Sequence, residues 1–268
     1  MKADGFFRLN PVFTKAEFSA RSAPDKAIRP RTVDSLLAYH VRAGRLLRLR
    51  RGLYAVVGPG SSAEAQPVDA FLVAAKLAAD AVLAYHTALE FHGKAYSVHE
   101  RLNYLTSSAA RPFRFRSQTF RCVAFPRSLV AKKQSLFEVK TLDRAGVSVR
   151  VTSLERTLVD VLDRPDLSGG WEEVWRSLEL VEFFDLDLVI EYALLLENAT
   201  VTATVGFFLQ QHRDVLMVED KYLQPLKELR PRSPHYLERR RRDRGRLVPE
   251  WNLIVPQRIL DRTWEEVL

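Results

Sequence analysis

The chain has 268 residues, 47% of them hydrophobic, and it carries a formal net charge of +8. These values suit one large domain or two ordinary ones and argue against a disordered chain. No apolar run is long enough to span a membrane, and the residues after Met1 lack the pattern of a signal peptide. The lone Cys122 excludes an internal disulfide, so we interpret it as a small core residue and expect a cytoplasmic protein.

Positive charge is concentrated at the N-terminal end. Residues 1–60 hold 12 Lys/Arg and 4 Asp/Glu, whereas basic and acidic residues balance in the rest of the chain. Within that remainder, 101–137 has 8 basic residues and no acidic one, and 155–197 has 12 acidic residues against 3 basic ones. This distribution indicates an end that binds a polyanion, followed by a differently charged body.

A pair of helices is predicted near the start of the chain. The first covers 13–21, with Thr14 as its N-cap and Glu17 completing a capping box. The second begins at Thr32, a further cap candidate, and Gly44 is placed to end it. Its apolar stripe has the spacing of an amphipathic helix and consists of Val33, Leu36, Leu37 and Val41.

A basic β-hairpin is expected next, over 45–57. Apolar residues flank the turn Arg50-Arg51-Gly52, in which Gly52 can adopt a positive φ. Helix, turn, helix and basic hairpin is the order of a winged helix-turn-helix, so we assign 1–58 to such a domain. The segment GPGSSAEAQP at 58–67 indicates a linker, which we place at 59–66.

Residues 67–268 are predicted to form a larger domain of mixed α+β structure. We expect several strands within 101–125, one at 147–151 and a strand-like segment at 251–256. The expected helices lie at 68–79, 84–92, 153–163, 171–182, 186–197, 200–217 and 219–229. Because strands and helices cluster in separate stretches, the fold class of this domain is α+β.

The predicted winged helix-turn-helix suggests DNA contacts. A helix that enters the major groove needs donors near its N-terminal end and cations around it for phosphates. Between Lys26 and Arg51 there are eight basic residues and one acid, Asp34. The alternative is a module that contacts only protein and keeps a solvated basic face. We expect base contacts from Arg31, Thr32 and Ser35, and backbone contacts from Arg29, Arg48, Arg50 and Arg51.

Other charged stretches have two interpretations each. The segment 111–127 interleaves Arg with Phe, as in sites for single-stranded nucleic acid, but the same alternation predicts an amphipathic sheet, which we favour. The basic stretch 239–246 is a nucleic-acid contact or a solvated turn. The acidic residues of 155–197 are mainly expected on the solvent-exposed faces of amphipathic helices. The alternative is that they form a surface that binds a basic partner.

Metal and enzyme chemistry have little support. His86, His92 and His99 lack the i, i+4 spacing of a helical zinc pair, so we predict no metal site and no cofactor. The tripeptide Glu138-Val139-Lys140 has the Glu-x-Lys form of a nuclease strand, but 101–137 offers no acidic residue to hold the metal. We therefore predict that the protein is not an enzyme and name no catalytic residue.

Several segments, in this order, resemble the AbiEi family of antitoxins and transcriptional regulators of AbiE-type toxin–antitoxin systems. They are TVDSLLAYHVRAGRLLRLRRGLYAV at 32–56, LAYHTALEFHG at 83–93, VTSLERTLVDVLDRP at 151–165, the segment 206–237, and PEWNLIVP at 249–256. The third contains Thr152, Ser153, Glu155, Arg156, Thr157 and Asp160. In it, Ser153 can cap a helix on which Arg156 and Asp160 form an i, i+4 pair, and we interpret this as a fold signature first and a partner surface second.

The resemblance implies two domains with separate roles. The N-terminal domain is expected to repress its own operon by binding inverted repeats in double-stranded promoter DNA. The C-terminal domain is expected to counteract a nucleotidyltransferase-like toxin in phage defence. Such systems are classed as type IV, so a stable direct complex between toxin and antitoxin is not expected. A solitary regulator without a toxin is the alternative, and a DNA-targeted nuclease is a weaker one.

Overall fold

The computed structural model describes residues 3–22, 30–238, 245–262 and 264. It forms two compact units, each built from several stretches of chain. The first contains 1–83, 100–122 and 141–150, and the second contains 84–99, 123–140 and 151–268. The fold class is mixed α+β, as the sequence predicts. Among the described residues, no helix is both long and apolar enough to cross a membrane.

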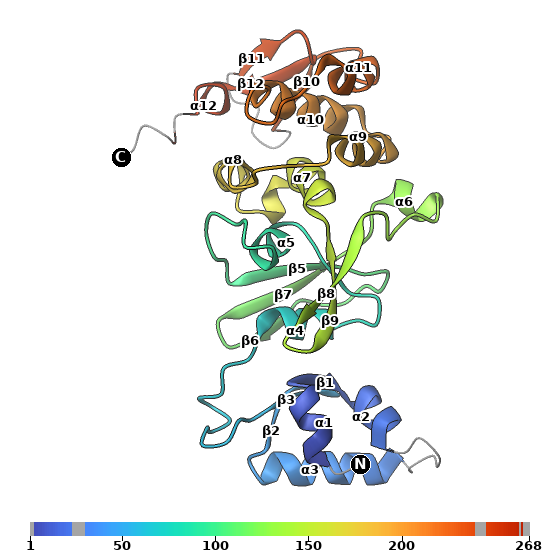
Figure 1. Cartoon of the computed structure of the whole chain (residues 1–268), viewed down its shortest axis with the longest axis vertical. Helices are drawn as coiled ribbons and strands as arrows, with labels where there is room; N and C mark the ends of the chain where they lie inside the picture. Colours follow the sequence, from blue (N-terminus) through green and yellow to red (C-terminus); the bar gives the residue numbers. More distant parts are fainter. Residues whose placement is uncertain (1–2, 23–29, 239–244, 263, 265–268) are drawn as a thin grey trace. The chain divides into compact units, whose positions relative to one another are not determined.

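Three helices and a small sheet occupy the start of the first unit (Figure 1). The expected pair of helices and the hairpin are confirmed, whereas α1 and β1 have no counterpart in the sequence prediction. The strand order is β1-β3-β2, with both pairings antiparallel. The elements are α1 (Ala3–Leu9), β1 (Val12–Thr14), α2 (Lys15–Ser22), α3 (Pro30–Arg42), β2 (Leu46–Arg50) and β3 (Leu53–Val56).

Aromatic side chains form the core of this N-terminal segment. Phe7 stacks on Phe13 at a centroid distance of 5.7 Å, and Phe13 stacks on Tyr54 of the hairpin at 5.8 Å. Each element therefore contributes at least one ring or aliphatic side chain to a single cluster, which fixes α3 against the hairpin. The buried members are Phe6, Phe7, Phe13, Phe18, Val33, Leu37, Leu46 and Tyr54.

The first helix cap is confirmed and the second is not. Glu17 Oε2 accepts from the backbone N of Thr14 at 2.7 Å, and Thr14 Oγ1 accepts from the backbone N of Glu17 at 3.2 Å, which is the reciprocal capping box. By contrast, α3 begins at Pro30, so Thr32 lies inside the first turn. Proline at the start of a helix loses no intrahelical hydrogen bond, which explains the earlier start.

A six-stranded sheet follows, with strand order β6-β7-β5-β4-β9-β8. The strands expected within 101–125 and at 147–151 are confirmed. The strand β8 contains Lys140, and neither β8 nor β4 was predicted. The elements in this part are α4 (Ala70–Ala75), β4 (Val82–Leu83), β5 (Arg101–Leu105), β6 (Phe113–Phe115), β7 (Gln118–Val123), β8 (Val139–Arg144) and β9 (Val147–Thr152).

The predicted linker contains no helix or strand, yet it is held in place. The side chain of Gln66 accepts a hydrogen bond from the backbone N of Gly58 at 2.8 Å. Arg116, at the turn between β6 and β7, donates to the carbonyls of Ala63, Glu64 and Gln66. The division into domains at 59–66 stays a prediction.

Helices dominate the second unit, and the five helices expected after residue 153 are confirmed. A small sheet of order β10-β12-β11 completes it, with β10 parallel and β11 antiparallel to β12. The elements are α5 (His86–Phe91), α6 (Arg127–Ala131), α7 (Leu154–Asp163), η1 (Pro165–Leu167), α8 (Trp171–Glu179), α9 (Leu186–Leu195), α10 (Ala199–Gln211), α11 (Asp220–Glu228), β10 (His235–Tyr236), β11 (Gly245–Val248), β12 (Leu253–Pro256) and α12 (Gln257–Leu260).

Candidate nucleic-acid interface

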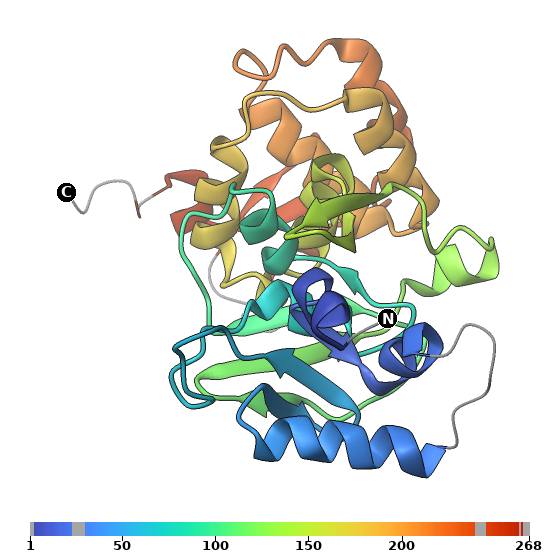
Figure 2. The same cartoon turned by 60° about the horizontal axis from the view of Figure 1, so that its bottom comes forward.

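The helix α3 presents three different faces. Val33, Leu37 and His40 point into the aromatic core and are buried. A second face is exposed and consists of Thr32, Ser35, Leu36 and Tyr39, which lie within one helical stripe. In Figure 2, α3 runs along the outer edge of its part of the chain, with the hairpin beside it. This outer face is exposed, whereas the buried face anchors the helix in the aromatic core.

A basic cavity of about 770 Å³ is lined by residues of α3, of the hairpin and of the start of α2. On the α3 side, the lining residues follow the stripe next to the outer face, and on the other side they come from the hairpin and from the start of α2. Four of the lining side chains are cationic and one is acidic. The lining residues are Lys15, Asp34, Ala38, Val41, Arg42, Arg48, Arg51, Gly52 and Tyr54.

The hairpin has a bulge, and its arginines differ in exposure on either side of it. The pairing register shifts between Arg48 and Arg50, and the intervening Leu49 is buried. Arg48 and Arg51 are exposed and line the cavity. Arg50 is half-buried instead, because it donates to the carbonyl of Leu77 at 2.7 Å and its guanidinium lies 5.7 Å from the ring centroid of Phe113.

The other predicted contact residues divide as follows. Thr32 and Ser35 share the exposed outer face of α3. Arg31 lies in the first turn of the same helix, and Arg29 falls outside the described residues. The structure thus brings together Thr32 and Ser35 on one face and Arg48 and Arg51 in the adjacent cavity.

Three residues of this region were not singled out by the sequence analysis. Lys15 and Arg42 line the cavity, and Tyr39 is 58% exposed on the outer face of α3. Tyr39 was detectable, because it lies one helical turn beyond Ser35. Lys15 was not, since its approach to the hairpin depends on a backbone hydrogen bond from its N to the carbonyl of Gly52, at 2.8 Å.

The basic strands form the amphipathic sheet that the sequence favoured. Phe113 and Phe120 face each other across β6 and β7 and stack at 5.6 Å, and Phe120 is 1% exposed. Arg114 and Arg121 are exposed. The Arg–Phe alternation is therefore explained by sheet packing.

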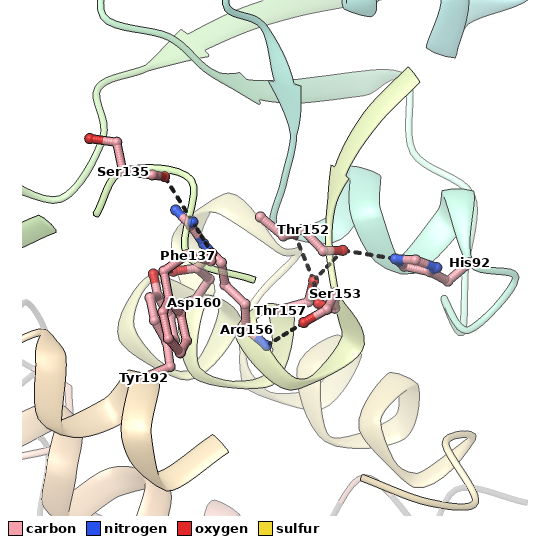
Figure 3. Close-up of polar contacts among 9 residues, drawn as sticks. All are labelled: His92, Ser135, Phe137, Thr152, Ser153, Arg156, Thr157, Asp160 and Tyr192. Carbon is pink, nitrogen blue, oxygen red and sulfur yellow. Dashed lines mark hydrogen bonds and ion pairs between the residues drawn. The ribbon is translucent and has the colours of Figure 1, made fainter. Parts of the chain in front are cut away.

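The segment from Thr152 to Asp160 builds a buried polar cluster in the second unit (Figure 3). Ser153 caps α7 by accepting from the backbone N of Arg156 at 3.2 Å. The guanidinium of Arg156 is fully buried, lies 3.4 Å from Asp160 Oδ2 and donates to the carbonyls of Ser135 and Phe137. The cap and the i, i+4 pair are confirmed, and their burial makes the partner-surface interpretation wrong for these two charged side chains.

A second buried cluster contains His86 and His99, two of the three histidines weighed above as metal ligands. His86 Nε2 and Nδ1 each lie 3.0 Å from a carboxylate oxygen, of Glu173 and Glu90 respectively. Burial works to lower the pKa of His86, but the two carboxylates outweigh it and raise the pKa. Burial likewise works to raise the pKa of Glu173, and hydrogen bonds from His86 and Ser97 bring it down to about 2.

The histidine cluster has the donor types of a metal site but not its geometry. Nitrogen or oxygen atoms of His86, His99 and Glu173 lie within 4.8 Å of one another. The two imidazoles stack with centroids 3.6 Å apart and planes at 7°, so their in-plane lone pairs run side by side. A tetrahedral ion needs ligands that converge from different directions. This arrangement fits a buried imidazolium held by carboxylates better than a shared ion.

Comparisons with known proteins agree with this picture at two levels. Residues 5–57 match the model of a family described as "Transcriptional regulator, AbiEi antitoxin", which confirms the resemblance seen in the sequence for that segment. No curated protein sequence matches the chain. Among solved structures, the RV2827C protein from Mycobacterium tuberculosis is similar, with a TM-score of 0.62 and 19% identity over 98% of this chain and 92% of that one. At this identity the likeness concerns the fold alone.

Proposed function

We propose that the protein is a DNA-binding transcriptional regulator whose first 58 residues act as a winged helix-turn-helix. The observation that carries this proposal is the exposed outer face of α3 beside a cavity with four cationic side chains. The outer face suits the major groove, and the cations suit the phosphates that flank it. The family match over 5–57 supports the same function.

The contact residues follow from these positions. Arg31, Thr32 and Ser35 are proposed to contact base edges, because all three lie in the first half of α3. Arg29, Arg48 and Arg51 are proposed to contact the backbone. The Arg50 side chain is occupied by Leu77 and Phe113, so its proposed role is to hold the hairpin rather than to bind phosphate. The target is double-stranded promoter DNA with inverted repeats.

We further propose that the chain is the antitoxin of a toxin–antitoxin system and works in the cytoplasm. The description of the matching family supports this role. Residues 67–268 would then counteract a nucleotidyltransferase-like toxin without a stable complex. No residue is assigned to catalysis. A solitary regulator is the second candidate, since the family match covers the N-terminal segment only.

A gel-shift titration on the chain's own upstream region, against a scrambled duplex of equal length, tests DNA binding. The wild type should prefer the upstream region, and its affinity should fall steeply between low and physiological salt because counterions are released. Arg31→Ala combined with Arg51→Ala should weaken binding strongly without lowering the melting temperature. Lys221→Ala is the matched control, because Lys221 is an exposed cation of the second unit on α11. Equal or absent binding to both duplexes would remove the regulator proposal.

A further inference from the structure

The cavity lined by α3, the hairpin and the start of α2 carries more cationic than acidic side chains. Its four cationic side chains come from three separate elements: Lys15 from α2, Arg42 from α3, and Arg48 and Arg51 from the hairpin. Only Asp34 opposes them among the lining residues, which leaves an excess of three positive charges. Like charges brought together in this way repel one another, so the arrangement favours an anionic occupant.

The walls of the cavity are held by the backbone rather than by its charged side chains. The hydrogen bond from Lys15 N to the Gly52 carbonyl ties the start of α2 to the hairpin turn. Arg48 and Tyr54 lie directly opposite each other in the β2–β3 register, and Tyr54 belongs to the aromatic core. The side chains of Lys15, Arg42, Arg48 and Arg51 are therefore able to reorient toward a ligand while the cavity persists.

Asp34 occupies a special position among these cations. Its Oδ1 lies 2.5 Å from Lys15 Nζ, and both side chains are partly exposed, at 57% and 37%. An exposed ion pair of this kind contributes little to stability. It opposes an anionic ligand, because Asp34 both pairs with Lys15 and adds a negative charge to the site.

We infer that this cavity receives a backbone phosphate of duplex DNA, bound by Lys15 and Arg42 together with Arg48 and Arg51, and that Asp34 restrains the affinity. This inference rests on the proposed function and adds two contact residues and one restraining residue to it. The cavity-lining positions Asp34, Ala38 and Arg42 lie on the stripe of α3 next to the outer face. With the outer face in the major groove, that stripe meets the sugar–phosphate edge of the groove.

Three variants and one control test the inference in the full-length protein. Lys15→Gln and Arg42→Gln should each weaken binding to the upstream region and to a scrambled duplex by the same factor. Each should also reduce the slope of log affinity against log salt by about 0.9, the value for one phosphate contact on B-DNA. Asp34→Asn should tighten binding to both duplexes, by about two- to fivefold, the range of an exposed charge pair. Lys221→Gln on α11 should leave affinity and slope unchanged.

The outcomes separate this inference from the proposed function. If the wild type binds neither duplex selectively, the proposed function fails, whatever the variants do. If the wild type binds its upstream region but Lys15→Gln and Arg42→Gln keep the wild-type slope, only the phosphate cavity is overturned. Weakening by Asp34→Asn on the upstream region alone would also overturn it, because Asp34 would then read a base. Inorganic phosphate that raises the melting temperature of the wild type, with DNA slopes unaffected by the variants, would identify a site for small anions instead.

Discussion

Arg156 shows how a single residue can hold the second unit together. Its buried guanidinium pairs with Asp160 and donates hydrogen bonds to the carbonyls of Ser135 and Phe137, so it links α7 to the segment that precedes β8. Removing one partner of a buried ion pair leaves the other charge without compensation. We expect Arg156→Met to lower the free energy of unfolding by about 3–5 kcal/mol, measured by urea denaturation.

A double variant distinguishes buried charge from lost packing in this cluster. Arg156→Met with Asp160→Leu removes both charges and should recover part of the loss, because apolar groups of similar volume can replace a buried pair. Tyr192 donates to Asp160 Oδ1 at 2.6 Å, so the recovery will be incomplete. A double variant as unstable as the sum of the two single variants would contradict the electrostatic explanation.

The histidine cluster makes stability depend on pH in two ranges. The pKa of Glu173 is lowered from 4.5 to about 2, so its contribution is present above pH 4.5 and is lost as the pH falls toward 2. The pKa of His86 is raised, so its contribution is full below pH 6.5 and is lost as the pH rises through the raised value. Since Glu173 is 9% exposed, its shift corresponds to roughly 3 kcal/mol.

Urea denaturation of Glu173→Gln beside the wild type, at pH values from 2 to 8, measures this contribution. The difference in unfolding free energy between the two proteins should be largest near pH 5–6 and should shrink as the pH falls from 4.5 toward 2, where the wild-type carboxylate begins to take up its proton. It should also narrow as the pH rises through the raised pKa of His86, where the folded protein loses the imidazolium charge. A difference that stays constant with pH would show that Glu173 contributes through packing alone.

At the scale of helices and strands, local sequence patterns predicted the features that depend on neighbouring residues, such as helix caps and turns. Thr14 and Glu17 identified the start of α2, and a turn containing Gly52, whose φ is +79°, identified the hairpin. Short elements without a period, such as α1 and β1, were missed because three to seven residues carry too little pattern. The start of α3 was placed too late because Thr32 suits a cap and Pro30 suits a first turn.

The candidate site was predictable only in part, because some of its residues come together only when separate helices and strands pack against one another. Thr32, Ser35, Arg48 and Arg51 belong to the helix and hairpin that the sequence located, so they could be named in advance. The cavity itself depends on packing between α2, α3 and the hairpin, which brings Lys15 next to Asp34. Similarly, His86 meets His99 and Glu173 only because α5, α8 and the loop before β5 fold together. Spacing along the chain does not contain that information.

At the scale of the whole molecule, charge separates the two proposed roles. The excess of positive charge equals that of residues 1–60, whereas the rest of the chain is balanced and 155–197 is strongly acidic. The proposed DNA binding would therefore depend on the basic segment, because phosphate contacts supply the affinity. The acidic stretch 155–197 would repel DNA, which favours a different role for the second unit. A defect in the proposed DNA binding should consequently leave the proposed antitoxin role intact.

Arg48→Ala combined with Arg51→Ala provides that test in cells. Both side chains are exposed, so the variant should fold normally and lose repression of a reporter placed behind the upstream region. Supplied from an unrelated promoter, the same variant should still protect cells that express a nucleotidyltransferase-like toxin encoded beside it. Loss of both repression and protection at wild-type protein levels would mean that the N-terminal segment itself takes part in neutralisation. Retained repression would instead contradict the placement of the hairpin on DNA, whatever the outcome for the toxin.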